Sequence, residues 1–207
     1  MVARSLFLSL ATAAVGVLAV DPVGNGPWTS VNPSFNVQRC GGGTATDTEF
    51  QLPAAPDGST DGPGCSNGHL RAERRYKNDY DSGVHQFGGQ FVINSFGGNK
   101  VALKQTFNGG SGSPYFIMAV KNDGSLYSVE GGKTIASGVA GVGQTVTINT
   151  VHDTANNLYQ VYVNGQLSYT DNGAPDGNFY DKYGAYTTNS GTGPIDVTWT
   201  NVQFWTS

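Results

Sequence analysis

The chain has 207 residues, of which only 13% are charged, and its formal net charge is −4 at pH 7. An acidic balance with so few charges argues against a general nucleic-acid-binding protein. The 30 glycines, 10 tyrosines and 10 phenylalanines are typical of a β-sandwich with many turns and untypical of a helical protein.

The first twenty residues have the pattern of a secretory signal peptide. Arg4 precedes an apolar run from Leu6 to Leu18, and small residues such as Ala19 follow before Asp21. Such a run is too short and wrongly flanked for a membrane span, and no later run is long enough. We therefore expect a signal peptide over 1–20, one domain over 21–207, and a secreted, extracellular product without a membrane partner.

Two cysteines, Cys40 and Cys65, remain after the signal. In an oxidising compartment their expected state is one disulfide, whereas two isolated cysteines make a poor metal site. The segment between them is rich in Gly, Pro and Asp and cannot pack a core of its own. We therefore expect the disulfide to stabilise this segment.

Strand-like runs separated by turn signals follow, and no helical period appears. Gly88-Gly89 predicts a bulge inside one run, and Asn164-Gly165 predicts a two-residue hairpin. Some ten short antiparallel strands predict an all-β jelly-roll sandwich of two antiparallel sheets. We expect the protein to be a monomer. The runs are 70–77, 84–94, 100–107, 115–120, 125–129, 144–152, 158–163, 166–170, 180–188 and 195–205.

The first run concentrates positive charge. Four of the ten basic residues left after Arg4 is removed (11 − 1 = 10) lie within 71–77. Alternation places Arg71, Glu73 and Arg75 on one side of the strand, together with Lys77. A basic strip on an acidic protein is suited to an acidic polymer, and the Arg fork pairs well with carboxylates. A surface ladder neutralised by Glu73 is the alternative.

Two later runs carry polar side chains at positions with strand parity. Gln105 shares its strand parity with apolar neighbours. It is therefore either a core amide with its hydrogen bonds satisfied or a polar group that points into a cleft. Tyr180, Lys182, Gly184 and Tyr186 share another face, which is an odd core face but a plausible cleft floor, with Gly184 leaving room for a ligand.

Three histidines and one acidic turn complete the candidates. His85 lies on a run expected beside the Arg row, whereas His69 and His152 sit at the ends of expected elements and are weaker candidates. The turn at 78–81 is a weak candidate for a structural calcium ion, and no other metal or cofactor is expected.

These rows resemble alginate lyases of polysaccharide lyase family seven. That family carries an Arg-Ser/Thr-Glu-Leu-Arg strand, a Gln-Ile/Val-His strand and a Tyr-Phe-Lys-Ala-Gly-x-Tyr strand. The likeness spans roughly 68–205 and implies a concanavalin A-like fold. The matching residues are Arg71, Glu73 and Arg75 in the first row, Gln105 in the second, and Tyr180, Lys182, Gly184 and Tyr186 in the third.

One departure affects the chemistry that the resemblance implies. Phe107 stands where the family has its catalytic His. Glucuronan lyases, which are related jelly rolls, take their His from a different strand than the Gln, and this points to His85. Alternation groups His85 with Phe87 and Phe91, so the glycine bulge would have to switch the phase of the strand for His85 to reach the cleft.

The resemblance implies cleavage of glucuronan or alginate by β-elimination, without a cofactor. In this interpretation Gln105 and an arginine, Arg71 or Arg75, neutralise the substrate carboxylate. Tyr186 is the acid, or both acid and base, and His85 is the base or holds the carboxylate. Glu73, Arg75, Tyr180 and Lys182 would contact the substrate.

Two other classes of protein remain open from the sequence. A glycoside hydrolase needs two carboxylates facing the cleft, and Glu73 has no obvious acidic partner. A lectin-like module could bind an acidic polysaccharide through the same rows without cutting it.

Overall fold

The computed structural model describes residues 20–65 and 68–207, and in these ranges the chain forms fifteen β-strands and no helix. No element of these ranges could cross a membrane as a helix. Apart from Val20, the expected signal peptide lies outside the described residues. The strands are β1 (Thr29–Val31), β2 (Phe35–Cys40), β3 (Thr44–Ala45), β4 (Glu49–Leu52), β5 (Arg71–Tyr76), β6 (Val84–Phe96), β7 (Lys100–Asn108), β8 (Ser113–Lys121), β9 (Leu126–Ser128), β10 (Thr134–Ala136), β11 (Thr145–Asp153), β12 (Leu158–Val163), β13 (Gln166–Asp171), β14 (Phe179–Tyr186) and β15 (Ile195–Thr206).

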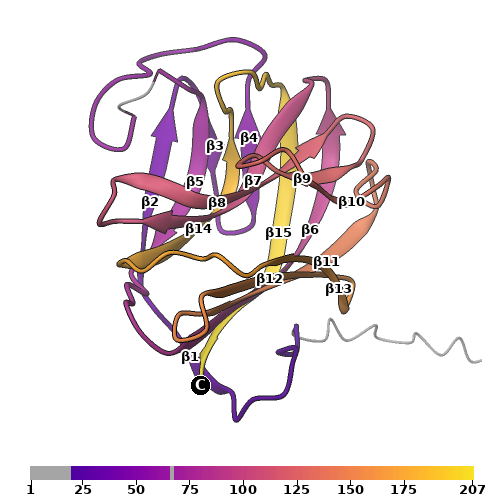
Figure 1. The fold of residues 1–207 in the computed structure, drawn as a ribbon. Helices are drawn as coiled ribbons and strands as arrows, with labels where there is room; N and C mark the ends of the chain where they lie inside the picture. Colours follow the sequence, from indigo (N-terminus) through magenta and orange to yellow (C-terminus); the bar gives the residue numbers. More distant parts are fainter. Residues whose placement is uncertain (1–19, 66–67) are drawn as a thin grey trace, which may run out of the picture.

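The strands form a sandwich of two antiparallel sheets, which confirms the predicted fold class (Figure 1). One sheet has seven strands in the order β10-β9-β8-β7-β14-β5-β2. The other has eight, in the order β13-β12-β11-β6-β15-β4-β3, with β1 paired to β15. Strands far apart in sequence are thus neighbours, and β14 lies between β5 and β7. This order brings the three polar rows onto adjacent strands.

Large apolar side chains fill the space between the sheets. Phe50, Phe91 and Trp199 are each at most 1% exposed, and the indole N–H of Trp199 donates to the carbonyl of Gly184 in the facing sheet. Inward side chains leave the alternate positions of β5, β7 and β14 pointing outward. The outer face of the seven-stranded sheet is therefore available to carry function.

The predicted bulge lies in a different strand. The pairing of β6 with β11 runs without a shift, whereas β15 places Asn201 and Val202 opposite Gly89 alone. Both glycines have a packing reason instead, because a Cβ on Gly88 would lie 2.8 Å from the Trp205 ring and one on Gly89 3.1 Å from Trp199. The prediction of a bulge within β6 was wrong, and β6 lacks the phase switch that His85 needed to face the cleft.

The expected disulfide is present. Cys40, at the end of β2, is bonded to Cys65, and their Cα atoms are 5.5 Å apart. The link ties the loop that follows β4 to the end of β2, an edge strand of the seven-stranded sheet. Gly64, next to Cys65, reaches the pocket described below.

Candidate active site

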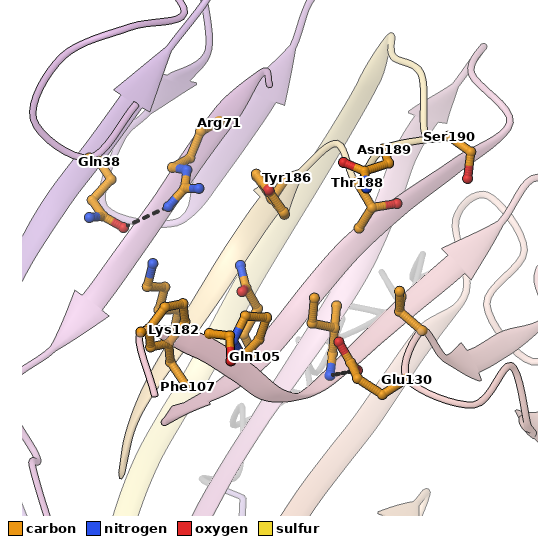
Figure 2. Close-up of a pocket in the computed structure, with 16 residues that line it drawn as sticks. Gln38, Arg71, Gln105, Phe107, Glu130, Lys182, Tyr186, Thr188, Asn189 and Ser190 are labelled. Carbon is orange, nitrogen blue, oxygen red and sulfur yellow. Dashed lines mark hydrogen bonds between the residues drawn. The ribbon is translucent and has the colours of Figure 1, made fainter. Parts of the chain in front are cut away.

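A pocket of about 540 Å³ opens on the outer face of the seven-stranded sheet (Figure 2). This volume is in the range of small-molecule sites. Arg71 comes from β5, Gln105 and Phe107 from β7, and Lys182 and Tyr186 from β14. The pairing of β14 with both neighbours sets these side chains in register, with Tyr186 opposite Arg71 and Lys182 opposite Gln105. The fold thus gathers three distant segments around one cavity.

Arg71 is held in place at the wall of the pocket. Its Nη1 donates to Gln38 Oε1 at 3.2 Å and lies 3.5 Å from Glu73 Oε2. The guanidinium carbon stands 4.5 Å from the centre of the Tyr186 ring. Arg71 is 7% exposed, so its charge is poorly hydrated and directed at what the pocket holds. Sequence reasoning missed Gln38, since nothing in the run 35–40 marks it as a site residue.

Glu73 fixes the orientation of Gln105. The carboxylate is fully buried, and its Oε1 accepts a hydrogen bond from Gln105 Nε2 at 2.5 Å. A carboxylate can only accept, so the amide nitrogen of Gln105 must face it. That nitrogen carries a second hydrogen, which an anion in the pocket can accept. Glu73 therefore acts on the site from behind it.

Tyr186 lies on an apolar floor built from β7, β8 and β9. Ala102, Ile117, Ala119 and Tyr127 form this cluster with it, and Tyr186 is 8% exposed. Rings packed in this way have little rotational freedom. The phenol is therefore held at a defined place in the pocket.

The histidine beside this pocket is His69. Its Nε2 is 2.9 Å from Asn189 Oδ1, and its ring centre is 5.7 Å from that of Tyr186, edge to face. Asn189 itself lines the pocket. The sequence made His69 a weaker candidate, but it has the parity of Arg71 and Glu73, and extending the alternation by one step towards the N-terminus places it on their side.

The structure does not bring His85 to this site. It lies on β6 in the eight-stranded sheet, where its ring stacks on Tyr80 at 3.8 Å and its Nε2 bonds the carbonyl of Ser82 at 2.8 Å. Burial lowers the pKa of His85. It borders a separate cavity together with Lys77 and Trp205. The prediction depended on a phase switch in β6 that does not occur.

His152 is also remote from the pocket. It is 2% exposed in the interior, with Nδ1 3.0 Å from the hydroxyl of Tyr80. Burial lowers the pKa of His152 to about 4. Its imidazole is therefore neutral at physiological pH and packs as a core residue.

Lys182 adds a second cation to the pocket. It is 4% exposed, and burial lowers its pKa to about 8, opposed by Glu73 and reinforced by Arg71 and Arg75. Its Nζ lies 4.9 Å from the centre of the Phe107 ring. A lysine in this setting loses its charge under mildly alkaline conditions.

Arg75 and Tyr180 flank the pocket without lining it. Both terminal nitrogens of Arg75 bond the carboxylate of Asp79, at 2.9 and 2.5 Å, so its charge is already matched. Its guanidinium stacks on Tyr180 at 3.8 Å, and Tyr180 stacks on Phe107 at 5.1 Å. The two residues form a stack beside Phe107, and their expected contact with substrate stays a prediction.

Gly184 does not leave space for a ligand as expected. Its φ is +140°, and an added Cβ would meet the carbonyl oxygen of Ala72 at 2.3 Å and Phe50 at 2.8 Å. Glycine is required here by the close approach of β14 to β5 and the core.

The acidic turn at 78–81 is largely committed to other partners. Asp79 pairs with Arg75, and Asn78 bonds Asp181 at 2.8 Å. Within residues 20–65 and 68–207, no three His, Cys, Asp or Glu side chains gather as a metal site.

Known structures share this architecture. An alginate lyase from Pseudomonas aeruginosa superimposes with a TM-score of 0.61 at 17% identity, over 77% of this chain and 82% of that one. An alginate lyase from Corynebacterium gives a TM-score of 0.59 at 20% identity, over 75% of each chain. A family 7 alginate lyase in complex with substrate gives 0.56 at 16% identity, over 77% of each chain. The fold is that of family 7 alginate lyases.

The likeness lies in the fold and not in the sequence as a whole. No family model matches the chain, and no curated protein matches it. Identities of 13–20% among these neighbours carry the architecture alone. What the site does has to be argued from its residues.

Proposed function

We propose that this chain is a secreted polysaccharide lyase that cleaves a uronic-acid polymer, glucuronan or alginate, by β-elimination. The observation that carries the proposal is the convergence of Arg71, Gln105 and Tyr186 in one pocket, with His69 against the tyrosine ring. A sandwich shared with alginate lyases supports it.

The proposed reaction needs no water and no redox partner. A base removes the C5 proton of a uronate, the electron pair forms the C4=C5 double bond, and the C4–O bond breaks. The leaving oxygen then takes a proton from an acid. The C5 proton is weakly acidic because the adjacent carboxylate is negative, so this carboxylate has to be neutralised.

The wall and floor of the pocket supply these roles. Arg71 and the second amide hydrogen of Gln105 would bind the carboxylate, and Lys182 adds charge beside them. Tyr186 would give the proton to the leaving oxygen, and it or His69 would take the C5 proton. Asn189 orients His69 through Nε2. His69 thus takes the role assigned to His85 from the sequence.

A panel of uronic-acid polymers incubated with the pure protein tests the proposal. Ultraviolet absorbance of the conjugated product should grow with time on at least one of them. Tight binding without product would indicate a lectin-like protein. Reducing ends without unsaturation would indicate a hydrolase, which the burial of Glu73 against Gln105 disfavours.

The lowered pKa of Lys182 leads us to expect a loss of activity at alkaline pH. The amine is charged below its pKa of about 8 and neutral above it, so attraction for an anionic polymer is lost as the pH rises through that value. We expect kcat/KM to fall there and Lys182→Arg to move the fall to higher pH. Initial rates measured at pH values around 8 test this prediction. If kcat/KM of Lys182→Arg falls at the same pH as that of the wild type, Lys182 does not set the alkaline limit.

Glu73→Gln should lower kcat about tenfold or more, because the new amide can donate as well as accept and no longer fixes Gln105. KM and kcat measured separately show whether positioning is lost. Glu49→Gln, at an exposed site on β4, is the control. A Glu73→Gln variant with unchanged kcat would remove Glu73 from this role.

A further inference from the structure

An acidic side chain stands at the end of the pocket away from Arg71. Glu130 follows β9 and is exposed at the rim. Its Oε2 accepts the backbone N–H of Ile117 at 2.7 Å, which fixes the carboxylate to the sheet (Figure 2). Ile117 stands opposite Gln105 in the pairing of β7 with β8. The carboxylate is thus anchored one strand beyond the amide that is proposed to hold a uronate.

The register gives the pocket a direction. Lys182, Gln105 and Ile117 follow one another across β14, β7 and β8. Neighbouring strands are about 4.8 Å apart, so the cationic side and the Glu130 side are separated by about 10 Å or more. Positive charge lies at one end of the pocket and negative charge at the other, and the lining also includes the apolar side chains of Ile117 and Val129.

This polarity bears on which polymer the pocket accepts. A chain with a carboxylate on every sugar would carry a second negative charge towards Glu130, where like charges repel. A sugar without a carboxylate avoids that repulsion and can donate hydroxyl groups to Glu130. Resting on the function proposed above, we propose that Glu130 is a specificity residue. Among uronic-acid polymers it favours one in which the bound uronate is followed, at the Glu130 end, by a sugar without a carboxylate, and it slows cleavage of a polymer such as glucuronan or alginate, in which every sugar carries one.

A structural role for Glu130 can be separated from this one. The backbone pairing of β8 with the segment after β9 ends at the bond from the Val129 N–H to the Ile117 carbonyl. The N–H of Ile117 donates to the Glu130 side chain instead of to a backbone carbonyl. Glu130→Gln keeps an oxygen that can accept from Ile117 and removes only the charge. Asp123→Asn, in the exposed turn between β8 and β9 and outside the pocket, removes the same charge elsewhere.

The test compares two forms of the uronan that the wild-type enzyme cleaves. One is the native polymer, and the other is the same polymer with part of its carboxylates chemically reduced to alcohols, so that the linkages are unchanged. We expect wild-type kcat/KM per uronate to be roughly three- to tenfold higher on the reduced polymer at low salt. Glu130→Gln should raise the rate on the native polymer by a similar factor, and Asp123→Asn should not.

Each outcome decides between the two proposals. A Glu130→Gln rate on native polymer that matches Asp123→Asn, or a wild-type enzyme without preference for the reduced polymer, overturns the role of Glu130 and leaves the lyase proposal standing. The absence of unsaturated product from every polymer overturns both. A gain that does not shrink as salt is added would contradict an electrostatic cause.

Discussion

The Tyr186→Phe variant is expected to lose release of unsaturated product, by about 10³-fold or more. The change removes one hydroxyl and keeps the ring that packs on Ala102 and Ala119, so the floor of the pocket is preserved. General acid catalysis by a positioned group contributes about 10²–10⁴-fold, and the proposed mechanism gives Tyr186 one or both of the proton transfers. Ultraviolet absorbance of the product, followed over time, gives the measurement.

Tyr127→Phe provides the matched control for this variant. Tyr127 belongs to the same apolar cluster as Tyr186 but does not line the pocket. We expect it to keep wild-type activity. If Tyr186→Phe turns over at the wild-type rate, the phenol has no part in proton transfer and the mechanism proposed here fails.

The second large effect is expected at His69. His69→Ala should lower kcat/KM about 10²-fold or more, because the imidazole held by Asn189 is the one that the structure places beside Tyr186. The melting temperature of the variant should change little, since His69 is half-buried beside the pocket and is not part of the core. Product release and thermal melting are measured on the same preparation.

His85→Ala reverses this pattern. His85 stacks on the buried Tyr80 and bonds the carbonyl of Ser82, so its removal should lower the melting temperature and leave kcat/KM per folded molecule unchanged. Activity that disappears from a well-folded His85→Ala protein while His69→Ala stays active would return the catalytic role to His85.

Much of the fold could be predicted because most of the strands and turns are determined by short sequence patterns. The alternation from 144 to 152 predicted β11, and Asn164-Gly165 predicted the turn between β12 and β13. The strands β1, β2, β3, β4 and β10 were not predicted, and three of them (β1, β3 and β10) have only two or three residues and are defined by their partners. Local periodicity carries little information over such lengths.

The site was predictable wherever strand parity alone decides it. Arg71, Gln105, Lys182 and Tyr186 lie in one pocket because β14 pairs with both β5 and β7. Glu130 could not be predicted, because it follows a strand and reaches the pocket only through its bond to Ile117. The prediction that His85 reaches the cleft depended on a bulge in β6. The structure has the bulge in β15 instead, and the sequence of β6 alone cannot show this.

Phe107 and His69 have a consequence for how a site of this kind is recognised from sequence. A linear signature that demands an imidazole two positions after the amide rejects this chain at Phe107, although an imidazole stands beside the phenol from another segment. A template built from the spatial arrangement of guanidinium, amide, phenol and imidazole groups would accept it. A search by that linear motif alone therefore misses any sandwich protein that brings these four groups together from other positions in the sequence.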